Sequence, residues 1–149
     1  MLSVSLVKEK NIKIEVSCSN WKEVAQEVGN ILVKDNIVEY EYIDLTIQSI
    51  VEHGPYVLLV PGIAFFHTNP NKYVNETGLS FITLEKPVYF NEDEKKKKIN
   101  CAFAFAAVDS DSHLELLTKL ADILRDKNLI NILKNHPIKD EVIDIFKKI

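Results

Sequence analysis

The chain has 149 residues, of which 46% are hydrophobic and 27% are charged, and its formal net charge is −4. These values are typical of a globular protein with its own core, so we expect a single domain over residues 1–149. The negative charge disfavours nucleic acid as a partner, because binding to it depends on a dense lysine and arginine surface. No apolar run reaches the roughly 18 residues of a membrane span, and the N-terminus lacks a signal-peptide pattern, so we expect a cytoplasmic protein.

The first third of the chain predicts one strand and two helices. A β-like alternation of apolar and polar residues falls within residues 1–18. Asn20 is a suitable N-cap with Glu23 three positions later, and the apolar residues that follow recur at helical spacing. This pattern predicts a helix over about 20–33, and a second amphipathic helix is predicted over 38–52.

The middle of the chain turns often, since three of its four glycines and three of its five prolines fall between positions 54 and 78. Two short apolar runs in this region, 56–60 and 63–66, predict buried strands. The second run ends at His67, and a polar, loop-like segment follows it.

Short strands are then predicted at 79–84 and 88–90, on either side of a Glu-Lys-Pro sequence. The charged run over 91–98 favours a solvated turn over a binding patch. Residues 100–108 are apolar almost throughout, which is typical of a central strand covered on both faces.

The last part of the chain is helical in pattern. Ser112, with Glu115 three residues later, predicts the cap of a helix over about 113–125. Shorter helices are predicted near 128–135 and 138–148. Because helices and strands are interspersed along the chain, we expect an α/β fold with a mixed sheet between helical layers.

The common catalytic motifs are missing from the sequence: there is no GxSxG elbow, Walker loop, GxGxxG or HExxH. The two cysteines lack the spacing of a zinc site, so neither a metal nor another cofactor is expected. Histidine chemistry remains, and a neutral imidazole is a competent nucleophile because its ordinary pKa is about 6.5.

His67 follows an apolar strand, which is where α/β sheets usually present reactive side chains. His113 lies in the first turn of the helix after the central strand. If the two strands are neighbours that end at one edge of the sheet, the two imidazoles meet there. The helix N-terminus beside His113 would supply free N–H groups for an oxyanion. Ile63, Phe65 and Phe66 would shield a phosphorylated histidine from water and dock a partner protein.

The histidines also have a purely structural interpretation. A single histidine after an apolar strand is more often a capping or core-edge residue than a catalyst. His53 lies between Glu52 and Gly54, which fits an ordinary helix end, and His136 precedes a proline in a loop. The residue pattern alone leaves both interpretations open.

The stretch EHGPYVLLVPGIAFFH, residues 52–67, resembles the active segment of sugar-phosphotransferase enzyme IIA proteins of the mannitol/fructose superfamily. Its Gly-Pro-Tyr and Pro-Gly-Ile-Ala elements point to the ascorbate-type branch. Further matches are Trp21, Tyr42, residues 86–90 and residues 106–114, so the resemblance covers about residues 20–145.

This resemblance implies that His67 accepts a phosphoryl group from the histidine phosphocarrier protein and passes it to a cysteine of an enzyme IIB. That protein in turn serves the membrane-embedded enzyme IIC, for a carbohydrate that is ascorbate-like or mannitol/fructose-like. His113 would stabilise the phosphoryl group, and His53 is a secondary candidate. The implied fold is a single domain with a mixed, mostly parallel β-sheet flanked by helices on both faces. The apolar helix faces would also permit a homodimer.

Two departures from the family pattern lie beside His67. The family commonly has proline before the histidine, where this chain has Phe66, and often Ala-Arg-Pro after it, where this chain has Thr68, Asn69 and Pro70. Losing the arginine removes a bidentate cation for phosphate, so that Thr68 and Asn69 would donate hydrogen bonds instead. The change motivates an alternative, a regulatory phosphoacceptor domain of the same fold that binds partners without onward transfer. A non-catalytic small-molecule-binding domain has no positive feature in the sequence.

Overall fold

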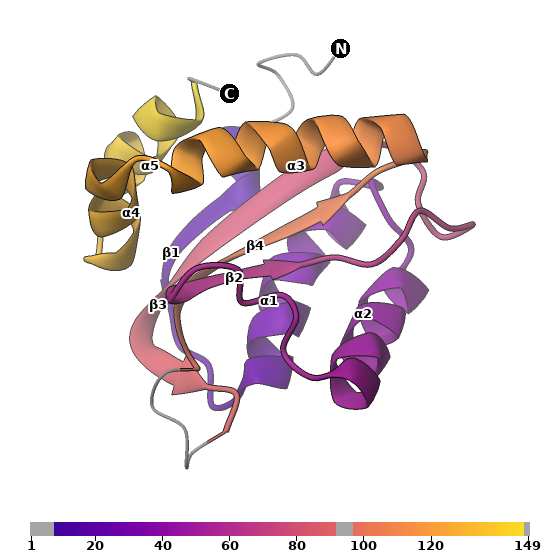
Figure 1. The fold of residues 1–149 in the computed structure, drawn as a ribbon, viewed down its shortest axis with the longest axis horizontal. Helices are drawn as coiled ribbons and strands as arrows, with labels where there is room; N and C mark the ends of the chain where they lie inside the picture. Colours follow the sequence, from indigo (N-terminus) through magenta and orange to yellow (C-terminus); the bar gives the residue numbers. More distant parts are fainter. Residues whose placement is uncertain (1–7, 92–96, 148–149) are drawn as a thin grey trace.

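A four-stranded sheet lies between two groups of helices in this computed structural model, which describes residues 8–91 and 97–147 (Figure 1). In chain order the elements are β1 (Ile12–Val16), α1 (Trp21–Lys34), α2 (Tyr40–His53), β2 (Gly62–Phe66), β3 (Gly78–Tyr89), β4 (Lys98–Ala106), α3 (Ser110–Leu124), α4 (Lys127–Lys134) and α5 (Lys139–Phe146). The strand order is β1-β3-β4-β2. The outer pairs are parallel and the central pair β3–β4 is antiparallel, so the expected mixed, mostly parallel sheet is confirmed. Among the described residues, no helix is both long and apolar enough to cross a membrane.

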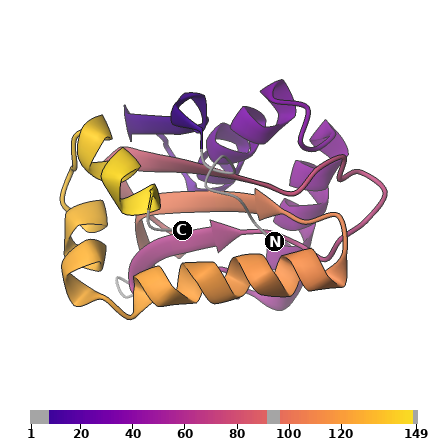
Figure 2. The ribbon, with the colours of Figure 1, turned by 90° about the horizontal axis from the view of Figure 1, so that it is seen from above.

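The side chains of β4 explain why helices cover both faces of the sheet. Successive residues of a strand point to opposite faces. Cys101, Phe103 and Phe105 belong to the core beneath α3, α4 and α5, whereas Ala102 and Ala104 belong to the core beneath α1 and α2. Both faces of β4 are therefore apolar and buried, and the two groups of helices lie on opposite sides of the sheet (Figures 1 and 2).

The N-caps of two helices decide where those helices begin. Asn20 caps α1 as predicted, since its Oδ1 accepts the backbone N–H of Glu23 at 3.0 Å. The prediction that Ser112 caps the next long helix is wrong: α3 begins at Ser110, and Asp109 is its N-cap. The Asp109 carboxylate accepts the N–H of Ser112 at 2.7 Å. Its negative charge suits the positive end of the helix dipole, and the Ser112 N–H is consequently not free for an oxyanion.

Residues 56–60 do not form the predicted strand. Helix α2 ends at His53 and is capped by Gly54, whose φ of 82° favours glycine, and the chain then turns at Pro55. Val57 is fully buried, and its carbonyl oxygen accepts the N–H of Phe65 at 2.8 Å. The apolar run therefore packs beside the edge strand β2 without becoming a strand itself.

The two strands predicted at 79–84 and 88–90 are one strand, β3. Its register with β4 shifts between Thr83 and Val88, and residues 85–87 are exposed there. A bulge of this kind accommodates the proline, because its missing N–H removes no bond from the regular ladder. The predicted solvated turn falls mostly on residues 92–96, which lie outside the described residues, as does the start of the β-like stretch predicted over 1–18.

Candidate active site

The ends of β2 and β4 bring two histidines together at one edge of the sheet. The two strands are parallel neighbours, so their arrowheads point toward the same edge, where α3 begins (Figures 1 and 2). His67 directly follows β2, and His113 lies in the first turn of α3. The centroids of the two imidazoles are 5.5 Å apart, so the expected meeting of these rings is confirmed.

One hydrogen bond determines the tautomer of His67. Its Nδ1 lies 2.6 Å from the carbonyl oxygen of Phe65. A carbonyl oxygen only accepts, so Nδ1 must carry the proton and donate it. In the neutral ring the lone pair is then on Nε2, which is the nitrogen left available as a nucleophile.

Aromatic rings enclose the imidazole of His67 on two sides. The ring of Phe105 stacks against it, with the centroids 4.4 Å apart and an angle of 14° between the planes. The ring of Tyr56 meets it edge-on, at 5.7 Å and 83°. These contacts leave His67 half-buried in apolar surroundings.

The same surroundings keep both imidazoles neutral. Burial lowers the pKa of His67 below its ordinary value of 6.5, and the nearby His113 lowers it further, whereas the hydrogen bond to Phe65 opposes the change. Burial also lowers the pKa of His113. Near pH 7 the Nε2 lone pair of His67 is therefore unprotonated, which a nucleophile requires.

His113 has an unused hydrogen-bonding atom. Its Nδ1 is buried and has no hydrogen-bond partner among the described residues. The ring lies against Phe105 as well as beside His67, with centroids 5.8 Å and 5.5 Å away. Because this nitrogen has no hydrogen-bond partner among the described residues, the His113 ring is suited to bind a charged group that is added to His67.

Two tyrosine hydroxyls complete the site, and the sequence interpretation missed both roles. The hydroxyl of Tyr56 donates to the carbonyl oxygen of His67 at 2.7 Å. The hydroxyl of Tyr42 donates to the carbonyl oxygen of Phe105 at 2.8 Å and accepts the N–H of Thr68 at 3.1 Å. A signal was present for Tyr42, because a tyrosine predicted on the inner face of a helix needs a partner for its hydroxyl.

The other predicted site residues, Thr68, Asn69 and His53, make no recorded side-chain hydrogen bond with His67 or His113 among the described residues. The backbone N–H of Thr68 donates to Tyr42, and the carbonyl oxygen of Asn69 accepts from Asn71 at 2.9 Å. The side chains of Thr68 and Asn69 have no recorded hydrogen bond among the described residues. The His53 side chain is 69% exposed at the end of α2, and its recorded contact is with Glu52 rather than with His67.

The expected docking role of three apolar neighbours is wrong. Ile63, Phe65 and Phe66 are at most 3% exposed, because both faces of β2 are covered by helices, so they cannot contact a partner protein. They are part of β2 itself and anchor the strand that precedes His67 in the two cores. Exposed apolar side chains near the site are instead Val108 and Leu114, which are 49% and 65% exposed on either side of the start of α3.

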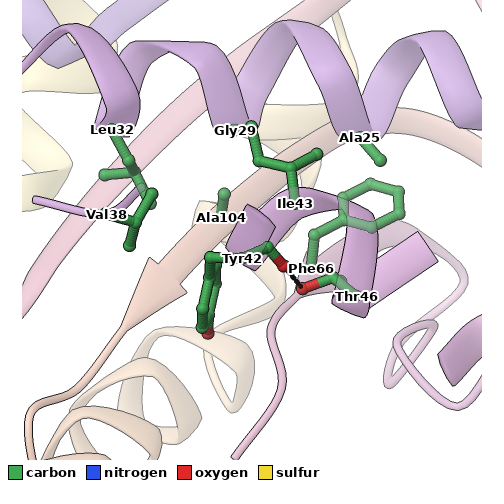
Figure 3. A pocket seen from close by; sticks show the side chains of 9 residues that line it. All are labelled: Ala25, Gly29, Leu32, Val38, Tyr42, Ile43, Thr46, Phe66 and Ala104. Atoms are coloured by element: carbon green, nitrogen blue, oxygen red, sulfur yellow. Dashed lines mark hydrogen bonds between the residues drawn. The ribbon is translucent and has the colours of Figure 1, made fainter. Parts of the chain in front are cut away.

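The pocket shown in Figure 3 lies between α1 and α2, on the face of the sheet opposite to α3. Its lining is mainly apolar, and its volume of about 10 Å³ would hold about one water molecule. It is therefore a packing gap, too small for a substrate. In the described part of the chain, no three His, Cys, Asp or Glu side chains gather as a metal site would require.

Comparison with known proteins identifies the family of this chain. Residues 5–149 match the family described as phosphoenolpyruvate-dependent sugar phosphotransferase system, EIIA 2. The ascorbate-specific PTS system EIIA component of Escherichia coli (strain K12) is 28% identical over 145 residues, which cover 97% of this chain and 94% of that protein. The solution structure of the mannitol-specific cryptic phosphotransferase enzyme IIA CmtB from Escherichia coli superposes with a TM-score of 0.88 at 26% identity and covers 99% of both chains.

A putative PTS IIA domain from Streptococcus pyogenes is also similar, with a TM-score of 0.85, 27% identity, and 99% and 96% of the two chains covered. The fold and the paired histidines thus occur in a protein of the phosphotransfer class. The chain belongs to the EIIA type-2 family of the sugar phosphotransferase system.

Proposed function

We propose that this chain is a cytoplasmic phosphoryl carrier that accepts a phosphoryl group on Nε2 of His67 and passes it on. The observation that carries the proposal is the hydrogen bond from Nδ1 of His67 to the carbonyl oxygen of Phe65, at 2.6 Å. This bond holds the imidazole in the tautomer whose Nε2 lone pair is free, and the lowered pKa keeps that lone pair unprotonated.

The donor is the histidine phosphocarrier protein. Nε2 of His67 attacks phosphorus, a P–N bond forms, and the P–N bond to the donor's histidine breaks with its electron pair returning to the donor nitrogen. In the second step a cysteine thiolate of an enzyme IIB attacks the same phosphorus, a P–S bond forms, and the electron pair of the P–N bond returns to Nε2. The Nδ1 proton stays on the imidazole throughout.

His113 stabilises the phosphorylated state. Its ring centroid is 5.5 Å from that of His67, so the charge of a phosphoryl group raises the pKa of His113 and favours its protonated form. The protonated ring donates to a phosphoryl oxygen. The Thr68 N–H is already bonded to Tyr42, so the Thr68 and Asn69 side chains are the groups left to supplement it.

The carrier serves uptake of an ascorbate-like carbohydrate through an enzyme IIB and a membrane enzyme IIC. The curated relative from Escherichia coli is named as specific for ascorbate, and the match covers almost the whole of both chains. The exposed apolar side chains Val108 and Leu114 flank the start of α3 and provide a docking surface for partner proteins.

A reconstituted transfer assay tests the proposal. The protein is incubated with labelled phosphoenolpyruvate, enzyme I and the histidine phosphocarrier protein, and ascorbate-type and mannitol-type enzyme IIB proteins are then added. We expect acid-labile phosphate on Nε2 of His67, located by ³¹P and ¹⁵N NMR, and its movement to an enzyme IIB cysteine.

The control is His136→Asn, because His136 lies between α4 and α5 with its Nδ1 2.8 Å from Oε1 of Glu15, and asparagine tolerates its positive φ of 50°. Label that is absent, or that persists in His67→Ala, overturns the proposal. Label that forms on His67 and never moves to any enzyme IIB favours the regulatory phosphoacceptor instead.

A further inference from the structure

The peptide bond that joins His67 to Thr68 has both of its polar groups bound by tyrosine hydroxyls. Its carbonyl oxygen accepts from Tyr56 at 2.7 Å, and its N–H donates to Tyr42 at 3.1 Å. The two tyrosines come from different segments: Tyr42 is in α2, and Tyr56 is in the turn after that helix. We refer to Tyr42, Tyr56 and this peptide as the tyrosine clamp.

Tyr42 also connects the clamp to the ring that packs on the nucleophile. Its hydroxyl donates to the carbonyl oxygen of Phe105, and the Phe105 ring stacks on His67. The side chain is only 3% exposed, and its hydroxyl points away from α1 and from the apolar lining of the pocket (Figure 3). Burial raises the pKa of Tyr42 to about 12, so the hydroxyl keeps its proton and remains a donor.

Tyr56 contributes in a second way, because its ring also touches the imidazole. The two rings meet edge-on at 5.7 Å, while the hydroxyl binds the carbonyl oxygen of the same residue. One side chain therefore fixes the main chain and the ring of His67 together. The residue before the nucleophile is Phe66, which does not restrict φ as a proline would, so constraint from the following peptide matters more.

We propose that Tyr42 and Tyr56 are positioning residues that hold the His67–Thr68 peptide and thereby keep the His67 imidazole in the orientation in which Nδ1 binds Phe65 and Nε2 is free. Rotation of this peptide moves the Cα–Cβ direction of His67 and lengthens the 2.6 Å bond from Nδ1. The inference rests on the proposed phosphoryl transfer only for its kinetic consequence, since the orientation itself exists in the unphosphorylated protein.

The test compares Tyr42→Phe, Tyr56→Phe and the double variant with Tyr40→Phe as the matched control. Tyr40 is in the same helix as Tyr42, is 45% exposed, and has no recorded hydrogen bond among the described residues. Loss of one hydroxyl is expected to lower kcat for transfer from the phosphocarrier about fivefold, with KM changed by less than about twofold. Because both hydroxyls hold one peptide, the double variant should lose less than the product of the two single losses.

A second readout needs no phosphoryl transfer. The ¹⁵N shifts of the His67 ring, measured above its pKa, should report a single tautomer protonated on Nδ1 in the wild type and in Tyr40→Phe. Both tyrosine variants should show a mixture of the two tautomers. If Tyr42→Phe does not fold, Tyr56→Phe carries the test, because Tyr56 is 36% exposed at the rim.

An unchanged single tautomer in the tyrosine variants overturns the proposal, and so does an unchanged kcat. If the wild-type protein accepts no phosphate, the proposed function fails, yet the NMR comparison still decides whether the two tyrosines position His67.

Discussion

The chemistry of His67 depends on groups that act on its two ring nitrogens differently. Nδ1 donates a hydrogen bond to the carbonyl oxygen of Phe65, whereas Nε2 does not take part in this bond and keeps its lone pair. Burial against Phe105 and Tyr56 disfavours the charged ring. A single side chain is thus held neutral and oriented by its immediate neighbours.

The pH dependence of the site follows from these neighbours. Burial lowers the pKa of His67 below its ordinary value of 6.5, so the midpoint of the acid limb of phosphoryl acceptance should lie below pH 6.5. The unfolded chain binds a proton on this residue near its ordinary pKa, so the free energy of unfolding should also decrease as the pH is lowered below 6.5. Histidine NMR titration and a pH–rate profile measure both effects. An acid limb with its midpoint at or above pH 6.5 would contradict the expectation.

His113→Ala should lower the rate of phosphoryl transfer by about tenfold or more, because the phosphoryl oxygens lose a donor in an apolar site. The fold should remain, since the ring makes no recorded hydrogen bond that would be lost. Rapid-quench measurement of label on His67 gives the transfer rate, and circular dichroism checks that the variant is folded. A near-normal rate would remove His113 from the site.

Among the elements, α3 matters most for the site because its start positions His113. The N–H of His113 donates to the carbonyl oxygen of Asp109 at 3.0 Å, and the Asp109 carboxylate binds the Ser112 N–H. The hydrogen bond from the Ser112 N–H is the main cause that lowers the pKa of the Asp109 carboxyl. The first turn that carries the second histidine is therefore fixed by one exposed carboxylate.

Asp109→Ala should fray the first turn of α3 and slow phosphoryl transfer, whereas Asp109→Asn, which preserves an N-cap oxygen, should retain most of the activity. Hydrogen exchange at the amides of the first turn measures the fraying directly. Ser112→Ala is the comparison, and it should have the smaller effect because Ser112 is not the cap. Equal protection of these amides in wild type and Asp109→Ala would refute this account.

The elements show why some features could be predicted and others could not. Helix α1 was predictable because Asn20 and the residues after it carry local signals, whereas residues 56–60 have the composition of a strand but make only isolated contacts with β2 instead of a continuous ladder. Ser112 and Asp109 are both suitable N-cap residues, and the structure uses Asp109, whose carboxylate accepts the Ser112 N–H. The pairing of the two histidines could be predicted from strand order, but hydroxyl bonds across 26 and 63 residues, such as those of Tyr42, have no local signature.

At the scale of the whole molecule, two cores meet at one sheet. Phe103 is the centre of one core, with its ring near those of Phe65, Phe81 and Phe146 at 4.8, 4.6 and 5.4 Å. Trp21 packs against the other core, on the opposite side of the sheet. Because β4 contributes side chains to both, the two cores should unfold together.

Phe103→Ala should lower the free energy of unfolding by about 3–5 kcal/mol, since the fully buried ring leaves a cavity. Urea unfolding followed by far-UV circular dichroism and by fluorescence of the single tryptophan should give coincident midpoints. Phe103→Leu is the milder control. A fluorescence midpoint that stays at its wild-type value while the circular dichroism midpoint falls would show that the cores are independent.

The parallel pairing of β2 with β4 also has a consequence for the order of protein synthesis. His67 is synthesised before Phe105 and His113, so for part of synthesis the chain carries an imidazole without its stacking ring or its neighbouring histidine. Nor can β2 find its partner strand until residues 98–106 have emerged. The aromatic enclosure and the histidine pair of the site are therefore assembled only in the nearly finished chain, although the groups that fix the tautomer precede His67.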